Sequence, residues 1–153
     1  MSATASFPHE TSVRVRYGEV DRMNVAYHAH YLVWFEHGRT EYLRSLGGTY
    51  RALEEEGTLL VVVESGVRHL GSAGYDDLLR VRTRLAEVRG VRMRFEYEIR
   101  REDERLATGF TVLASCDETG RPCRLPAAFR ERMLAQVSDG KAAAPAGVQE
   151  ESA

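Results

Sequence analysis

The chain has 153 residues, 43% of them hydrophobic and 29% charged, with a formal net charge of −2. This length fits one domain that is large enough to bury a core, and the composition is that of a soluble globular protein. The small negative charge gives no support for nucleic acid or a membrane surface as the main partner, and no stretch reaches the length of a transmembrane helix.

Two cysteines, Cys116 and Cys123, flank a predicted turn over residues 117–122. A disulfide between them is conceivable, but the N-terminus has neither the basic start nor the apolar run of a signal peptide. We therefore expect reduced thiols and a cytoplasmic protein.

The first half of the chain predicts one strand followed by two helices. Residues 1–10 are mostly small and polar and are expected to form a loose leader. Apolar and polar residues alternate over Thr11–Tyr17, which is the period of a strand. The period becomes helical over Ala29–Leu46, and Gly38 on its apolar stripe predicts close approach to another backbone. A short second helix, capped by its first residue, is expected over Thr49–Glu56.

The second half of the chain predicts four strands in antiparallel succession. An apolar run over Leu59–Val63, continuing to Leu70, is typical of a strand buried on both faces. Residues 79–85 and 91–99 alternate in polarity and are expected to form a hairpin. A more central strand follows over Leu106–Cys116, since it is apolar on both faces.

The predicted hairpin turns at Arg89-Gly90 and opposes Arg82 with Glu96 and Arg80 with Glu98. Cross-strand pairs of opposite charge stabilise such a register. We expect the charged face of the hairpin to be solvated and its other face to cover the long helix.

The chain ends with a predicted helix over Pro126–Val137 and a tail, residues 138–153, that is rich in Ala, Gly, Pro and Glu and is expected to be disordered. The folded domain is therefore expected over residues 11–137. The order of its elements predicts an α+β fold, in which one twisted antiparallel sheet wraps around one long helix.

A candidate site lies between the first strand and the long helix. Asp21 precedes the helix start, where free N–H groups and the helix dipole stabilise developing negative charge. A carboxylate base that faces such a helix end is half of an acyl-transfer site. The alternative is an ordinary loop or capping aspartate, although Asp21 comes several residues too early to cap the helix.

The spacing of Tyr17, Asp21 and His28, followed by Trp-Phe-Glu-x-x-Arg-Thr-Glu over residues 34–41, resembles the hotdog-fold acyl-CoA thioesterases. The similarity is to the branch that includes 4-hydroxybenzoyl-CoA thioesterase and the Tol–Pal-associated short-chain acyl-CoA thioesterases. It extends from Thr11 to Arg130 and implies the hotdog fold. The resemblance implies three roles: Asp21 is the general base or nucleophile, the backbone N–H of His28 polarises the thioester carbonyl, and Tyr17 orients Asp21 or water.

Three further residues are expected to contact the substrate. Tyr27 and Tyr31 would form the pocket wall, and Asn24 would narrow the pocket entrance. Asn24 stands where the resembling family usually has Gly, and Asn is the side chain that best tolerates the same positive φ. Gly71-Ser72 replaces the family's common Pro-Ala, so we expect a more mobile loop there.

Arg89 and Arg92 bracket the hairpin tip, where the resemblance places the CoA nucleotide. Arginine suits phosphate because it forms bidentate charged hydrogen bonds. No cofactor is implied. A metal site built from His28, His30 and His37 is not supported, because a two-residue spacing at a helix start does not aim both imidazoles at one point.

The residues and the resemblance together predict hydrolysis of a short-chain or aromatic acyl-CoA to the free acid and CoA. The alternatives are a non-hydrolytic protein that binds or senses acyl thioesters, a hydroxyacyl-thioester dehydratase, and an acyl-carrier-protein thioester as substrate. Exposed strand edges invite pairing, so we expect a homodimer, doubled into a homotetramer, in which His28 faces the partner's Val61–Ser65 segment.

Overall fold

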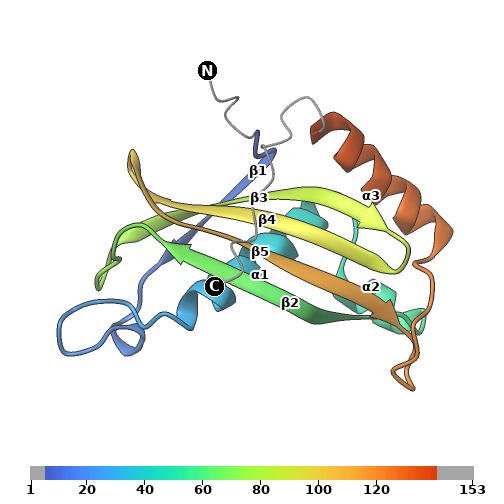
Figure 1. The fold of residues 1–153 in the computed structure, drawn as a ribbon, viewed down its shortest axis with the longest axis horizontal. Helices are drawn as coiled ribbons and strands as arrows, with labels where there is room; N and C mark the ends of the chain where they lie inside the picture. Colours follow the sequence, from blue (N-terminus) through green and yellow to red (C-terminus); the bar gives the residue numbers. More distant parts are fainter. Residues whose placement is uncertain (1–5, 141–153) are drawn as a thin grey trace.

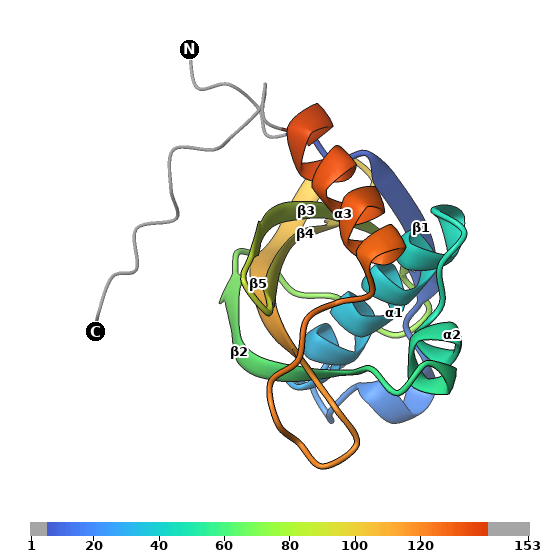
Figure 2. The same cartoon turned by 90° about the vertical axis from the view of Figure 1, so that its right-hand side faces the viewer.

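The strands of this chain form one antiparallel sheet that curls around a long helix, as the computed structural model of residues 6–140 shows (Figure 1, Figure 2). They lie in the order β1-β3-β4-β5-β2. The predicted sequence of elements and the α+β class are confirmed. The elements are β1 (His9–Arg14), the 3-10 helix η1 (Tyr17–Glu19), α1 (His30–Ser45), α2 (Tyr50–Glu55), β2 (Leu59–His69), β3 (Leu78–Arg89), β4 (Arg92–Arg101), β5 (Glu104–Cys116) and α3 (Ala127–Gly140).

The helix α1 supplies the centre of the core. Phe35 is fully buried and stacks on Tyr97 of β4, with 4.4 Å between the ring centroids. Gly38 faces β3, where an added Cβ would lie 2.7 Å from both Val81 Cγ1 and Thr83 Oγ1. The close approach predicted at Gly38 is therefore confirmed, although side chains of β3 rather than its backbone fill the space.

The helix α3 packs mainly against β3 and braces the hairpin tip. Its Phe129 and Met133 are buried, and Arg130 Nη1 donates a hydrogen bond to the Gly90 carbonyl at 2.9 Å. No helix within residues 6–140 combines the length and the apolar character that crossing a membrane requires.

The first strand begins earlier than the sequence predicts. His9 and Glu10, which the sequence analysis assigns to the leader, pair with β3 and start β1. β1 also ends earlier, at Arg14, because the chain turns into η1 from Tyr17. Residues 1–5 of the predicted leader lie outside the described residues.

The last helix runs further than predicted, since α3 continues to Gly140 and so includes the first residues of the predicted disordered tail. The rest of that tail, residues 141–153, lies outside the described residues. The short helix agrees with its prediction, because the Thr49 side chain accepts a hydrogen bond from Ala52 N at 3.0 Å and caps α2.

The β3–β4 hairpin is present, but its predicted register is wrong by two residues. Arg82 pairs with Glu98 instead of Glu96. A tight turn at Gly90, with φ of 59°, and a bulge after Leu85 set this register. A shift of two residues leaves every side chain on the same face of the sheet, so Arg82 still faces a glutamate, but Arg80 faces Arg100 instead of Glu98.

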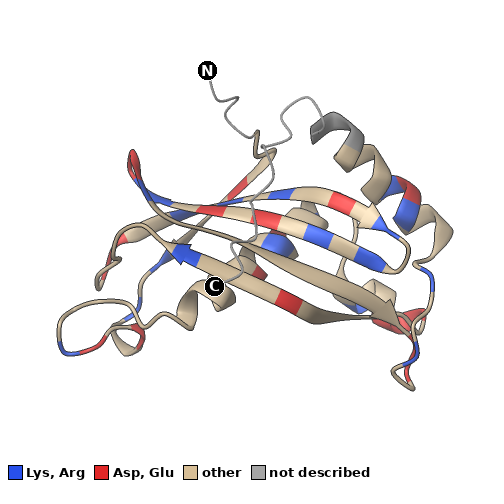
Figure 3. Ribbon diagram, viewed as in Figure 1, with Lys and Arg blue, Asp and Glu red and all other residues tan. Residues whose placement is uncertain are grey.

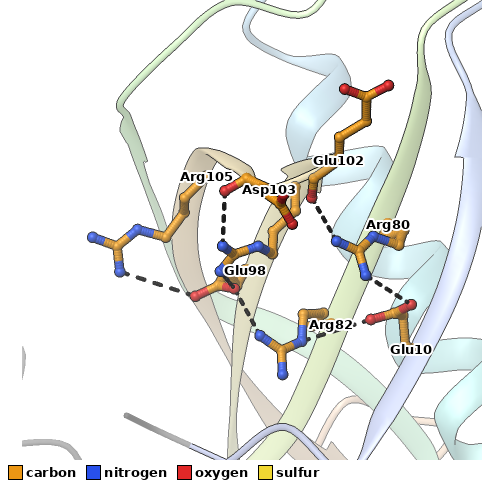
Figure 4. Close-up of polar contacts among 8 residues, drawn as sticks. Glu10, Arg80, Arg82, Glu98, Glu102, Asp103 and Arg105 are labelled. Atoms are coloured by element: carbon orange, nitrogen blue, oxygen red, sulfur yellow. Dashed lines mark hydrogen bonds and ion pairs between the residues drawn. The ribbon is translucent and has the colours of Figure 1, made fainter.

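Many arginines and glutamates lie along β3 and β4 (Figure 3), and they occupy alternate positions, on the face of the sheet opposite to the residues that pack on α1. Glu98 is the centre of this network: its Oε1 accepts hydrogen bonds from Arg82 at 2.9 Å and Arg100 at 2.8 Å (Figure 4). Its Oε2 lies 3.9 Å from Arg105 Nη1. Glu98 and Arg84 are only 7% and 4% exposed, so this face is not simply solvated as predicted. Long neighbouring side chains cover part of it.

The strand β2 is an edge of the sheet, with β5 as its neighbour in the described part of the chain. Val61, Val62 and Val63 are 44%, 51% and 46% exposed. The prediction of a strand buried on both faces is therefore wrong for one protomer. Consecutive exposed valines on an unpaired edge make β2 a surface suited to pairing with another chain.

Both cysteines are free thiols, as expected. Cys116 is buried and forms an isolated bridge with Pro122 across the turn, next to Cys123. Neighbouring residues of an extended chain point to opposite sides, so the two thiols do not face each other.

Candidate active site

A cavity of about 280 Å³ lies where the Asp21 loop, the start of α1 and the end of β2 meet. Four of the residues predicted from the sequence line it: Asp21, Tyr27, His28 and Tyr31. The structure thus brings the predicted carboxylate and the predicted helix start together at one hollow of the surface.

The Asp21 loop has a tightly defined backbone. Val20 and Ala26 form an isolated bridge that closes the loop, and Asn24 at its tip has φ of 59°. Within it, Asp21 Oδ1 accepts hydrogen bonds from Met23 N at 2.8 Å and Val25 N at 3.2 Å. Within the described residues, the other carboxylate oxygen, Oδ2, has no hydrogen-bond partner and is available to a water or a substrate.

The start of α1, where His28 lines the same cavity, has unpaired backbone donors. The first turn is closed by His30 N and Tyr31 N, which donate to the carbonyls of Tyr27 and His28 at 3.0 and 3.2 Å. The N–H groups of His28 and Ala29 meet no acceptor among residues 6–140. Free N–H groups at the positive end of a helix dipole stabilise an oxyanion.

Tyr17 and Asn24, which are predicted to belong to this site, lie outside the lining of the cavity. Tyr17 is 79% exposed and makes an edge-to-face contact with Tyr75, with 5.6 Å between the centroids. Asn24 Oδ1 accepts a hydrogen bond from Tyr75 N at 2.9 Å, so its side chain joins the two loops. The orienting role of Tyr17 and the substrate contact of Asn24 stay predictions.

His69 is a cavity residue that the sequence analysis missed. It ends β2 and its ring meets Tyr31 edge-to-face, with 4.7 Å between the centroids. Burial raises the pKa of Tyr31, which is only 2% exposed, so the phenol stays protonated and packs beneath the imidazole. A histidine at the end of an apolar strand, just before a Gly-Ser loop, was the available signal.

Arg89 and Arg92 line a second cavity of about 580 Å³, together with Arg94, Glu64 and Glu87. This cavity lies toward the opposite end of the sheet from Asp21. Arg92 pairs with Ala114 on β5 while His69 pairs with Ala107, so about 24 Å of strand separates the two regions. Within one protomer the two predicted parts of the CoA site do not meet.

Three histidines raised a metal interpretation in the sequence. Across residues 6–140, no three His, Cys, Asp or Glu side chains are grouped closely enough to hold a metal ion. His30 instead lies beside a buried carboxylate, with His30 Nδ1 3.7 Å from Glu19 Oε2.

Known proteins share both the sequence and the fold of this chain. The sequence profile of the Thioesterase-like superfamily matches residues 15–133. An acyl-CoA thioesterase, YbgC from Haemophilus influenzae, is 40% identical over 131 residues, which cover 85% of this chain and 91% of that protein.

Solved structures agree. A DHNA-CoA thioesterase from Staphylococcus aureus has a TM-score of 0.81 at 29% identity, over 88% of this chain and 93% of that one. The hypothetical protein TT1821 from Thermus thermophilus has a TM-score of 0.80 at 33% identity, over 84% and 98% of the two chains. The chain therefore belongs to the Thioesterase-like superfamily, has its hotdog fold and is a thioester hydrolase.

Proposed function

We propose that this enzyme hydrolyses a short-chain or aromatic acyl-CoA to the free acid and CoA, with Asp21 and the start of α1 as its catalytic parts. The observation that carries the proposal is the shared cavity: the free Oδ2 of Asp21 and the unpaired N–H of His28 belong to residues that line one hollow. A volume of about 280 Å³ suits a small acyl group. Relatives that are named as acyl-CoA and DHNA-CoA thioesterases support CoA as the carrier.

The chemistry follows from these two groups. In one route Asp21 takes a proton from water, whose oxygen adds to the thioester carbonyl carbon; in the other, Asp21 itself adds and water then hydrolyses the anhydride. In both routes negative charge develops on the carbonyl oxygen, where the His28 N–H stabilises it. The C–S bond then breaks, and the leaving thiolate of CoA takes up a proton.

Replacing Asp21 tests the proposal most directly. Asp21→Asn keeps the shape and the Oδ1 acceptor but removes the basic and nucleophilic oxygen. We expect kcat for a panel of short-chain and aromatic acyl-CoA esters to fall by at least ~10²-fold, while Tm barely changes because Asp21 is exposed. Normal turnover by this variant would remove Asp21 from the mechanism. A wild-type protein that binds every ester of the panel without hydrolysing it would favour the non-hydrolytic alternative.

We further propose that the complete site requires a homodimer, in which β2 pairs with the partner's β2 about a twofold axis. Antiparallel pairing along β2 brings the start of one strand beside the end of the other. The partner's Arg89 and Arg92 would then approach the cavity of Asp21 and supply the charge for the CoA phosphates. Two such dimers would form the homotetramer. A fully active monomer in sedimentation experiments would contradict this arrangement.

A further inference from the structure

We propose that Glu19 is a positioning residue, which fixes the Asp21 loop against α1 so that the carboxylate and the His28 N–H keep their relative placement. This inference rests on the proposed role of Asp21. Glu19 lies two residues before Asp21, in η1, and is only 4% exposed. A carboxylate is seldom buried to this degree unless it is paired or hydrogen-bonded.

The two carboxylate oxygens of Glu19 join different parts of the chain. Oε1 accepts a hydrogen bond from the backbone N–H of Arg16, at 2.7 Å, ahead of the loop. Oε2 accepts one from Trp34 Nε1, at 3.2 Å, on the second turn of α1. The side chain therefore ties η1 to the helix whose first turn offers the oxyanion contact.

The backbone of Glu19 closes the far end of the same loop. Its carbonyl accepts a hydrogen bond from Tyr27 N at 2.9 Å, one residue before His28. One residue thus contacts the chain before the Asp21 loop, the chain after it, and the helix beneath it. A change at Glu19 acts on both catalytic groups at once, although it touches neither.

The hydrogen bonds of Glu19 favour its charged form. Burial alone would raise the pKa of Glu19, but the hydrogen bonds from Arg16 and Trp34 outweigh burial and hold that pKa below its ordinary value. The ionisable groups that face Glu19 are Arg16, with Nε 3.4 Å from Oε1, and His30. A buried charge keeps its donors because losing one leaves the charge unsatisfied, so η1 cannot slide along α1.

The test uses two variants, each of which changes one partner of the hydrogen bond between Trp34 Nε1 and Glu19 Oε2. Glu19→Gln keeps the shape but replaces one acceptor oxygen with an amide that faces another N–H donor. Trp34→Phe keeps an aromatic ring in the core and removes the indole donor. Because a misplacement of about 1 Å can cost roughly 10²-fold in rate, we expect either variant to lower kcat by about 10- to 100-fold with KM nearly unchanged.

A double-mutant cycle tells whether Glu19 and Trp34 act through their shared hydrogen bond or through two independent effects. The combination of Glu19→Gln and Trp34→Phe should cost little more than either change alone, because both break the same hydrogen bond. In an Asp21→Asn background, Glu19→Gln should lower the residual kcat by a smaller factor than in the wild type, since the part of its effect that acts through Asp21 is already lost.

Trp34 also provides a readout that does not depend on activity, because it is the one tryptophan of the chain. Loss of the charged acceptor at its Nε1 should shift the emission spectrum of folded Glu19→Gln. If Asp21→Asn proves fully active, the proposed function fails by itself, while the emission shift still reports whether Glu19 holds the helix.

Glu98→Gln is the matched control. Glu98 is another buried carboxylate with hydrogen-bonded donors, on the face of the sheet away from α1. We expect this variant to lower Tm and leave kcat unchanged. Wild-type kcat in folded Glu19→Gln, with or without an emission shift, would overturn the proposal. So would an equal loss of kcat in Glu98→Gln. Should Glu19→Gln not fold, Trp34→Phe with normal kcat would overturn it in the same way.

Discussion

Asn24 shows how a single side chain can preserve a loop at a position that favours glycine. Its φ of 59° lies in the left-handed region, which Asn tolerates better than other side chains. The amide then bonds to Tyr75 N, and a Cβ added at Gly74 would lie 3.2 Å from the Asn24 carbonyl oxygen. The side chain therefore ties the Asp21 loop to the neighbouring loop at Tyr75, while the greater mobility expected at Gly71-Ser72 stays a prediction.

Gly38 gives a prediction at the same scale. Alanine is the better helix former, but its Cβ would overlap Val81 and Thr83, both fully buried in β3. We expect Gly38→Ala to lower the free energy of unfolding by about 1–3 kcal/mol, because overpacking outweighs the gain of about 1 kcal/mol in helix propensity. Denaturant unfolding measures this difference. Gly18→Ala is the control, since nothing lies within 4 Å of its added Cβ, and equal effects at the two sites would contradict the packing argument.

At the scale of elements, the β3–β4 hairpin carries buried charged residues, such as Glu98, on a face of the sheet that is normally exposed to solvent. Burial would raise the pKa of Glu98, but the hydrogen bonds and charges of Arg100 and Arg82 more than offset burial and lower this pKa. A carboxylate with a lowered pKa stabilises the fold above its unfolded pKa of about 4.3, and that contribution is lost as the pH falls through the folded value.

The stability of Glu98→Gln should therefore depend on pH differently from that of the wild type. The variant should be less stable than the wild type at neutral pH. The difference in unfolding free energy should shrink as the pH falls below the ordinary glutamate pKa of about 4.3 and the wild-type carboxylate takes up its proton. Urea unfolding across this pH range measures the effect. Glu54→Gln, an exposed change on α2, should show no such convergence. A constant difference at every pH would mean that Glu98 stabilises the hairpin by packing alone.

At the scale of the whole molecule, the separation of Asp21 from Arg89 and Arg92 leads to a test by complementation. A heterodimer is assembled from one Asp21→Asn protomer and one protomer that carries Arg89→Ala and Arg92→Ala. If each site joins Asp21 of one protomer to the arginines of its partner, one of the two sites is intact. We expect about half of the wild-type kcat/KM per dimer, well above either parent.

The substrate provides the control for that experiment. Arg89→Ala with Arg92→Ala should raise KM for a CoA ester while sparing a truncated pantetheine ester, which lacks the nucleotide phosphates. A heterodimer no better than its parents would place both parts of the site in one protomer. Equal effects on the two esters would show that the arginines do not meet the nucleotide.

The sequence predicts those features that repeat or follow a known spacing. The pattern of polar and apolar residues locates the three α-helices and the five strands but not the 3-10 helix η1, and the spacing of Asp21 and His28 identifies two residues that line one cavity. The register of β3 and β4 escapes prediction, because it is set by the turn at Gly90 and by a bulge after Leu85 that puts Leu85 and Val88 on one face although they are three residues apart. Glu19 escapes it too, because a lone glutamate forms no pattern, and its buried partner Trp34 lies fifteen residues further along the chain.

The exposed edge of β2 links catalysis to solubility. Val61, Val62 and Val63 form an apolar segment of high β-propensity on a strand with one unpaired edge, which is the kind of template that recruits further strands during aggregation. An isolated protomer is thus a hazard during folding, and closed pairing with one partner removes the hazard. Substitutions that weaken the proposed dimer should therefore reduce the yield of soluble protein during expression before the specific activity of the remaining soluble protein changes.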